Sequence, residues 1–220
     1  MNYLTDMMLL ALNFFYSITG NYGYAIIFLT MAINFALYPL TLSSIVQMNA
    51  VQKIQPKITE LQKRLKDKPD QLQKETMELY KQEKVNPFGG CLPMLLKIPF
   101  FIALFFALQS NQFLNIITTP GVHASFFWIG NLAKPDHTYI LIVLIGLTTY
   151  LSQKTMPTSG NQQMASMMYI MPFFIAFISK DFASGLQIYW IVSNLVAVAQ
   201  QWYITNSLKK RGTNVSRETF

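Results

Sequence analysis

Long apolar stretches alternate along this chain with one strongly polar stretch. A helix needs about 20 mainly apolar residues to cross the roughly 30 Å hydrocarbon core of a bilayer. Five segments approach this length and composition, and we predict that each forms a membrane-spanning helix. They lie at 21–48, 92–114, 139–156, 164–178 and 185–204. The pattern therefore predicts an all-α, polytopic membrane protein.

Composition excludes several other classes. Only 12% of the 220 residues are charged and 52% are hydrophobic, whereas soluble domains carry about 25% charge. A soluble globular enzyme and a disordered tail are therefore excluded. The single cysteine, Cys91, has no partner for an internal disulfide, and it forms no recognised zinc motif with the isolated His123 and His137.

The positions of lysine and arginine predict the orientation of the chain. With the N-terminus outside, segments 43–93, 152–163 and 206–220 face the cytoplasm and together hold fourteen basic residues, whereas the outer segments hold only Lys134 and Lys180. Cytoplasmic loops are enriched in basic residues, so the N-terminus is expected outside and the basic tail at 206–220 inside. The net charge of +7 is then explained by orientation, and nucleic-acid specificity is not expected.

Residues 1–20 are expected to form an amphipathic helix in the outer membrane interface. Their apolar residues recur at helical spacing: Leu4, Met7, Met8, Ala11, Leu12 and Phe15. A signal peptide is the alternative. Its basic beginning is absent, because no lysine or arginine precedes Lys53.

Residues 49–86 are polar and are predicted to form a cytoplasmic helical hairpin. Two narrow apolar stripes lie on either side of Pro69, which is expected to break the helix, with Asp70 as the N-cap of the second helix. One interpretation is a solvated connector. The other is a mobile arm that contacts the ribosome, targeting factors or lipid headgroups.

Polar residues inside the predicted spans are informative, because such groups are costly in lipid and usually face protein or water. Thr30 and Asn34 lie four residues apart on one helix face, and Lys97 lies near the start of the second span. The last span carries further polar residues: Gln187, Ser193, Asn194, Gln200 and Gln201. Lys97 either extends to the interface or faces a hydrated cavity, and Thr30 and Asn34 either bond neighbouring helices or line that cavity.

Three prolines, Pro39, Pro99 and Pro172, are expected to kink or interrupt their spans.

No combination of residues indicates catalysis. The chain has no HExxH helix, no GxSxG turn and no phosphate-binding glycine loop. Asp136 and His137 are expected in a short exposed loop before the third span, with a structural role. We therefore predict neither an enzyme nor a cofactor or metal site.

Several collinear segments resemble the YidC/Oxa/Alb family of membrane protein insertases. The most specific is KVNPFGGCLPMLLKIPFFIALF at 84–105. The others follow in the family's order: GNYGYAIIFLT with YPLT (20–41), IQPKI (54–58), MELYKQEKVNP (77–87), QKTMPTS (153–159) and SGLQIYWIVSNLVAVAQQWYI (184–204).

The resemblance implies the function of a membrane protein insertase and membrane-protein folding chaperone, which acts alone or with a Sec-type translocon, and it implies a set of partners. It implies five core spans around a hydrophilic groove that opens to the cytoplasm and to lipid. Such a groove takes hydrophilic segments of nascent membrane proteins partway into the bilayer and releases the apolar helix into lipid. The expected location is the bacterial plasma membrane, in the short form that lacks a large extracytoplasmic domain. The expected partners are nascent chains, lipid and, through the hairpin and tail, a Sec-type translocon, the ribosome and targeting factors.

One position departs from the family pattern. The family's groove arginine corresponds to Asn34 here, and Lys97 stands where the family commonly has glutamine. Our hypothesis is that the positive charge of the groove has moved to Lys97, which would attract acidic substrate segments. Thr30, Tyr189 and Trp190 match positions at which the family meets substrate, and Gln187 is predicted to line the same groove.

Two other functions remain open from the residues. A channel or secondary transporter is one, although transporters usually show internal repeats and five spans with one hairpin show none. A membrane scaffold that docks partners through its hairpin is the other. A scaffold would tolerate the loss of polar groove residues, whereas an insertase would not.

Overall fold

A computed structural model describes residues 2–66, 68–86, 92–155 and 162–215. Within these ranges the regular structure is helical, apart from an isolated β-bridge between Phe126 and Ile129. The helices are α1 (Asn2–Thr19), α2 (Tyr22–Ala36), α3 (Tyr38–Arg64), α4 (Pro69–Gln82), α5 (Leu92–Gln109), α6 (Asn111–Thr118), α7 (Ile140–Thr155), α8 (Gln162–Ser179) and α9 (Ser184–Val215). The predicted all-α class is confirmed. Cys91 and the end of the basic tail, 216–220, lie outside the described residues.

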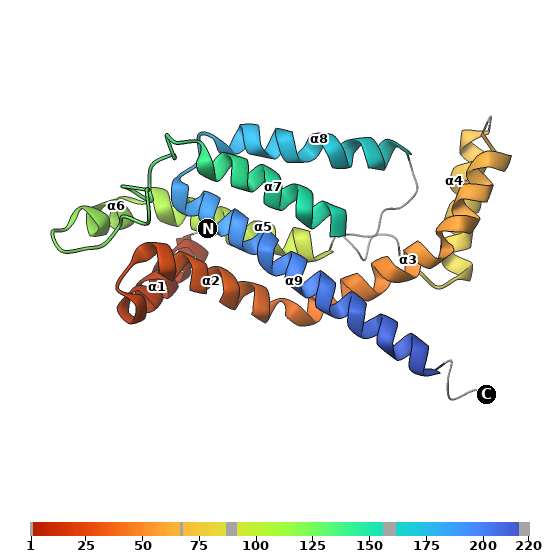
Figure 1. Cartoon of the computed structure of the whole chain (residues 1–220), viewed down its shortest axis with the longest axis horizontal. Helices are drawn as coiled ribbons and strands as arrows, with labels where there is room; N and C mark the ends of the chain where they lie inside the picture. The colour runs from red at the N-terminus through yellow and green to blue at the C-terminus, as the bar shows by residue number, and fades with distance from the viewer. Residues whose placement is uncertain (1, 67, 87–91, 156–161, 216–220) are drawn as a thin grey trace.

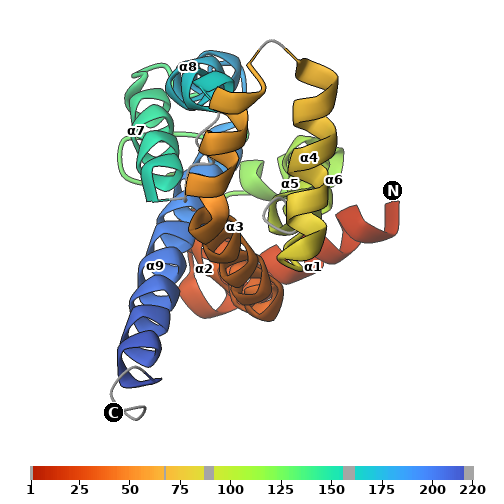
Figure 2. The ribbon, with the colours of Figure 1, turned by 90° about the vertical axis from the view of Figure 1, so that its right-hand side faces the viewer.

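The helices form a bundle in which α9 packs against both α2 and α7 (Figure 1). Helix α8 covers α7, and α1 packs on α2 and α5. The hairpin of α3 and α4 extends from one end of the bundle, together with the C-terminal end of α9, whereas α6 and the end of α1 near α2 lie at the opposite end (Figures 1 and 2).

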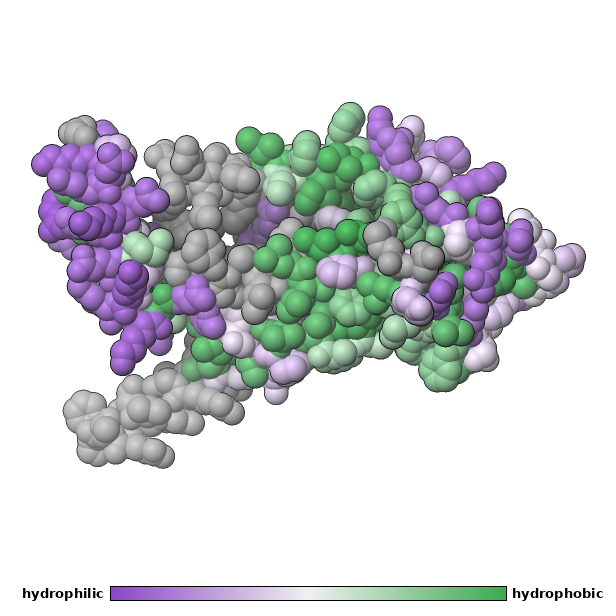
Figure 3. Space-filling view, turned by 180° about the vertical axis from the view of Figure 1, so that it is seen from behind, coloured by the Kyte–Doolittle hydropathy of each residue, from purple (hydrophilic) through white to green (hydrophobic). Residues whose placement is uncertain are grey.

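Within the described residues, no single helix is both long and apolar enough to cross a membrane. Two bent pairs qualify together: 22–36 with 38–64, bent by 60°, and 95–109 with 111–118, bent by 55°. Figure 3 shows hydrophobic side chains gathered across the middle of one face, with the hydrophilic hairpin at one end and a second hydrophilic region at the other.

The bends lie at two identifiable residues. The first lies at Leu37, two residues before Pro39. Proline lacks the N–H needed inside a continuing helix, so Pro39 stands in the first turn of the new helix α3. The second lies at Ser110, whose Oγ accepts a hydrogen bond from the N–H of Phe113 and caps α6. Pro99 and Pro172 do not interrupt α5 and α8, which continue through them.

The hairpin differs from the prediction in two details. Helix α3 is continuous from Tyr38 to Arg64, so the second part of the first predicted span and the first hairpin helix form one element. The prediction of Asp70 as an N-cap is wrong, because α4 begins at Pro69 and its N-cap is Lys68. Proline suits the first helical position, where no N–H partner exists, and Asp70 instead places its charge in the first turn.

Three helices approach each other closely at Gly185, at the end of the bundle away from the hairpin. A Cβ at Gly185, at the start of α9, would lie 2.9 Å from Ile26 Cδ1 and 3.0 Å from Leu108 Cδ1. The main-chain N–H of Gly185 also donates to Leu132 O at 2.9 Å. Helices α2, α5 and α9 therefore meet without space for a side chain at this glycine.

Asp136 is buried, with 6% of its surface exposed, which corrects the expectation of an exposed loop position. Its carboxylate accepts hydrogen bonds from the N–H and Oγ1 of Thr138 and from the N–H of Leu141. These donors lie at the start of α7, where a negative group stabilises the helix. The structural role predicted for this residue agrees with these contacts. His137 is exposed.

Candidate functional site

Thr30 and Asn34 form the α2 side of a buried polar site. Their exposed fractions are 0% and 1%. The Thr30 hydroxyl donates to Ile26 O at 2.6 Å, and Asn34 Nδ2 donates to Thr30 O at 2.8 Å. The main donors of both side chains are thus used within their own helix.

Helix α9 supplies the facing side chains. Asn34 Nδ2 also lies 3.4 Å from Ser193 Oγ, and Gln200 Nε2 donates to Asn34 O at 3.3 Å. The buried Tyr189 hydroxyl lies near the Ser193 side chain, one helical turn away. We call Thr30, Asn34, Tyr189, Ser193 and Gln200 the polar seam between α2 and α9.

Lys97 lies on α5, on the face that turns toward α9. Phe101 follows Lys97 by four residues and so shares its face, and the Phe101 ring packs 6.2 Å from Tyr189 and 5.2 Å from Trp190. Lys97 is half-buried, and its ammonium forms no ion pair or hydrogen bond with any residue in the described part of the chain. A cation is therefore held one helical turn from the aromatic contact of α5 with α9.

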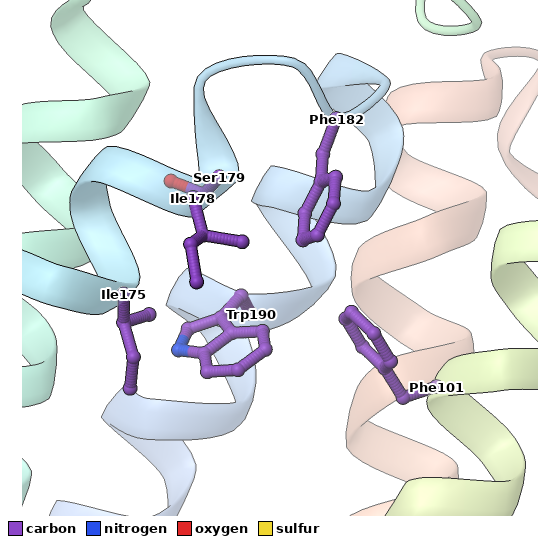
Figure 4. Close-up of a pocket in the computed structure, with 6 residues that line it drawn as sticks. All are labelled: Phe101, Ile175, Ile178, Ser179, Phe182 and Trp190. Carbon is purple, nitrogen blue, oxygen red and sulfur yellow. The ribbon is translucent and has the colours of Figure 1, made fainter.

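Trp190 also lines a cavity of about 240 Å³ between α5, α8 and α9 (Figure 4). The other lining residues are Phe101, Ile175, Ile178, Ser179 and Phe182. This lining is almost entirely apolar, so the cavity suits hydrocarbon rather than water or a polar chain. Its apolar lining differs from that of the hydrophilic groove that the sequence predicts.

Gln187 does not join the polar seam. Its Nε2 donates to Ser179 O at 2.7 Å, and the side chain is 1% exposed. It therefore holds the C-terminal end of α8 against α9. Of the six predicted site residues, Thr30, Asn34 and Tyr189 meet in the seam, and Phe101 connects Trp190 and the face of Lys97 to it.

The sequence identifies Ser193 and Gln200 as polar residues of a predicted span, but it does not predict their contacts with Asn34. Their spacing of seven residues, which places both on one helix face, was the available signal. Asn194, the residue after Ser193, faces α7 instead, where its Nδ2 donates to Thr149 Oγ1 at 3.0 Å. One helix therefore carries polar contacts to two different neighbours.

The side chains of the site form hydrogen bonds and carry charge. The site offers amides, hydroxyls and one ammonium, and no group of three or more histidine, cysteine, aspartate or glutamate residues that could hold a metal occurs within the described ranges. Such groups recognise polar segments by hydrogen bonding and charge.

Comparisons with known proteins give a consistent result. The model of a family described as 60Kd inner membrane protein matches residues 14–211. The membrane protein insertase YidC of Geobacter sp. (strain M21) is 41% identical over 92% of this chain and 37% of its own length. That of Francisella tularensis subsp. novicida (strain U112) is 38% identical over 93% of this chain and 36% of its own length.

The fold also has a solved counterpart. A crystal structure of an active YidC insertase, with its first transmembrane domain resolved, has a TM-score of 0.75 and 24% identity, and the match covers 92% of this chain and 46% of that one. The chain thus spans a little over a third of the length of the two relatives and less than half of the solved chain.

Proposed function

Because the chain belongs to the 60Kd inner membrane protein family, the YidC family whose motifs it carries, we propose that it is a membrane protein insertase. It takes hydrophilic segments of nascent membrane proteins into a groove and releases their apolar helices into lipid, alone or with a Sec-type translocon. The proposed location is the bacterial inner membrane. Two relatives at 38% and 41% identity are insertases by name, which supports this function.

The observation that carries the proposal is the polar seam, together with Lys97. Buried polar groups within membrane-spanning helices are costly and usually serve a function. Here four buried polar side chains and the partly buried Ser193 lie between two helices, and a half-buried cation lies on a third. A site that handles polar segments inside the bilayer accounts for this arrangement.

The proposed topology has five crossings. They are the bent pair α2–α3, the bent pair α5–α6, and α7, α8 and α9, with the N-terminus outside. The position of the hairpin and of the C-terminal end of α9 at the same end of the bundle supports it (Figure 1). The hydrophobic middle of the surface in Figure 3 supports it as well. In this orientation α1 lies in the outer interface.

The mechanism follows from the energetics of transfer. A groove that admits polar residues shortens the hydrocarbon path that a translocated segment must cross. Burial of the substrate's apolar helix in lipid then drives the reaction without nucleotide hydrolysis by the insertase. Lys97 attracts acidic residues of the incoming segment, Asn34 contributes neutral hydrogen bonding, and Tyr189 and Trp190 contact the substrate.

The hairpin is proposed to be the arm that meets the ribosome, targeting factors or lipid headgroups. Two ion pairs, Lys57–Glu83 and Arg64–Glu75, connect its helices. Ile54 and Ile58 of α3 are buried. These contacts allow the arm to move as one unit at the end of α3.

Reconstitution in sealed liposomes tests this function. A ribosome-free single-span substrate with an acidic tail is added, and the fraction protected from protease is compared with that in empty liposomes. We expect insertion by the wild type, a loss with Lys97→Gln, and recovery in the double variant Lys97→Gln with Asn34→Arg. Wild-type insertion no greater than in empty liposomes would overturn the function. Equal insertion by all variants would remove the role assigned to Lys97.

A further inference from the structure

Two buried amides of the polar seam share one orientation. The NH₂ groups of Asn34 and Gln200 each donate to a main-chain carbonyl, Thr30 O at 2.8 Å and Asn34 O at 3.3 Å. A carbonyl oxygen only accepts hydrogen bonds. The contacts therefore fix which end of each amide carries the nitrogen, and they leave Asn34 Oδ1 and Gln200 Oε1 as the free ends.

These two oxygens have no hydrogen-bond partner in the described part of the chain. Their residues are 1% and 7% exposed, so both oxygens are enclosed by the bundle. An enclosed acceptor without a donor is unfavourable, because it has lost its hydrogen bonds to water. Among the amides, the seam thus contains two unused acceptors and no unused donor; the buried Tyr189 hydroxyl, which can donate or accept, also has no partner among the described residues.

The hydrogen bonds that close the seam are weak. Asn34 Nδ2 lies 3.4 Å from Ser193 Oγ, and Gln200 Nε2 lies 3.3 Å from Asn34 O. Both distances exceed the usual range for such bonds, which ends near 3.2 Å. At this level, separating α2 from α9 would break only these two long hydrogen bonds between the helices. A ligand with hydrogen-bond donors would then satisfy Asn34 Oδ1 and Gln200 Oε1.

We propose that the polar seam binds hydrogen-bond donors of the translocated segment. The donors are main-chain N–H groups and the side-chain amides of asparagine and glutamine, and they bond to Asn34 Oδ1 and Gln200 Oε1 when the seam opens. This inference rests on the proposed insertase function. It assigns a substrate class, neutral amide-rich segments, that differs from the acidic segments attracted by Lys97.

The two substrate preferences belong to different helices and can be separated. A carboxylate offers acceptors only and gains nothing from the two free amide oxygens, Asn34 Oδ1 and Gln200 Oε1. The Lys97 ammonium on α5, in contrast, only donates hydrogen bonds. It can bond to the carbonyl oxygens of an amide-rich tail, but that tail carries no opposite charge to attract it. Changes in the seam are therefore expected to affect amide-rich tails selectively, and changes at Lys97 to affect acidic tails.

The test compares three single-span substrates with tails of equal length that are rich in glutamine, glutamate or alanine. Insertion into proteoliposomes is measured for the wild type, Gln200→Met and Asn34→Leu. Methionine keeps the length of glutamine but lacks its amide. The matched control is Gln201→Met, since Gln201 is equally buried but donates toward Thr205 outside the seam.

We expect Gln200→Met and Asn34→Leu each to lower insertion of the glutamine tail by about three- to tenfold, the effect of losing one neutral hydrogen bond. Alanine and glutamate tails should change little, and Gln201→Met should leave all three unchanged. Equal losses for the glutamine and alanine tails, or no loss for either variant while the wild type inserts, would overturn the inference. Absence of insertion by the wild type would instead overturn the proposed function, and this inference with it.

Discussion

The Gln200 side chain donates a hydrogen bond to the main-chain oxygen of Asn34 across 3.3 Å. The two residues are 166 positions apart in the chain, so this bond joins α2 to α9. This contact lies in the polar seam, beside the weak contact of Asn34 with Ser193. Helices α2 and α9 therefore meet through amides and hydroxyls as well as through apolar packing. The proposed handling of polar segments depends on this relationship.

Substitution of Gly185 by alanine should loosen the end of the bundle away from the hairpin. The new Cβ would lie 2.9 Å from Ile26 Cδ1 and 3.2 Å from Leu132 O, which is main chain and moves little. Overpacking of this kind costs about 1–3 kcal/mol. We expect a lower thermal unfolding midpoint in detergent. Gly146→Ala is the control, since its Cβ meets Ala176 at 3.6 Å, and it should not lower the midpoint.

Gly23 and Phe126 should be energetically coupled. A Cβ at Gly23 would lie 2.1 Å from Phe126 Cδ2, so Gly23→Ala displaces the ring, at a cost of about 1–3 kcal/mol. In the Phe126→Gly background, which removes the ring and also the Phe126 Cβ that would lie 2.7 Å away, the same substitution should cost little. A double-mutant cycle of unfolding midpoints measures this coupling. Additive effects of the two substitutions would show that the ring does not pack on Gly23.

Asp136 should make stability depend on pH in the acid range. Burial raises the pKa of Asp136, but hydrogen bonds from Thr138 and Leu141 outweigh it and hold the pKa below its usual value. The folded state then binds this proton less readily than the unfolded state. The stabilisation is present above the unfolded pKa of about 3.9 and is lost as pH falls through the folded value.

Asp136→Asn tests this dependence. It removes the negative charge and should lower the free energy of unfolding by about 0.3–1 kcal/mol near pH 7, the usual value of an anion beside a helix N-terminus. The difference from the wild type should shrink below about pH 4, where the wild-type carboxylate becomes protonated. Unfolding midpoints between pH 7 and pH 3 measure it, and a difference that stays constant over this range would contradict the assignment.

The hairpin should depend on its apolar contact more than on its ion pairs. The pair Lys57–Glu83 is exposed, so Glu83→Gln should change stability by less than about 1 kcal/mol. Ile58 is buried, and Ile58→Ala should cost about 2–5 kcal/mol within this arm. Limited proteolysis between α3 and α4 should become faster for Ile58→Ala only. Faster cleavage of Glu83→Gln than of Ile58→Ala would reverse this order.

The sequence predicted the helical class and the approximate positions of most helices, because apolar runs and helical spacing are local signals. It placed α7 within one residue at each end, at 139–156 against Ile140–Thr155. It missed the break at Ser110, because Ser110 lies within a predicted apolar run and its capping bond to Phe113 is visible only in three dimensions. It also placed Asp136 on an exposed loop, since burial of a loop carboxylate depends on its neighbours.

The site was predicted less completely than the fold. Thr30 and Asn34 were expected to share a face because they are four residues apart, and both are buried together. The meeting of Asn34 with Gln200 is a contact between distant segments and leaves no local pattern. Gln187 was grouped with the site because it is a polar residue in the same span, but its bond to Ser179 places it against α8 instead. The position of a polar residue within a predicted span does not show which neighbouring helix its side chain faces.

Disulfide cross-linking during insertion tests the central claim most directly. Ser193→Cys places a thiol in the polar seam, and Leu195→Cys places one about 200° around the same helix, at a position that is 47% exposed. Both are made in a Cys91→Ala background, and the substrate carries one cysteine in its hydrophilic tail. The account predicts a cross-link to Ser193→Cys that forms only while insertion proceeds, and little or none to Leu195→Cys. Cross-links of equal yield at both positions, or at Leu195→Cys alone, would contradict passage of polar segments along the seam.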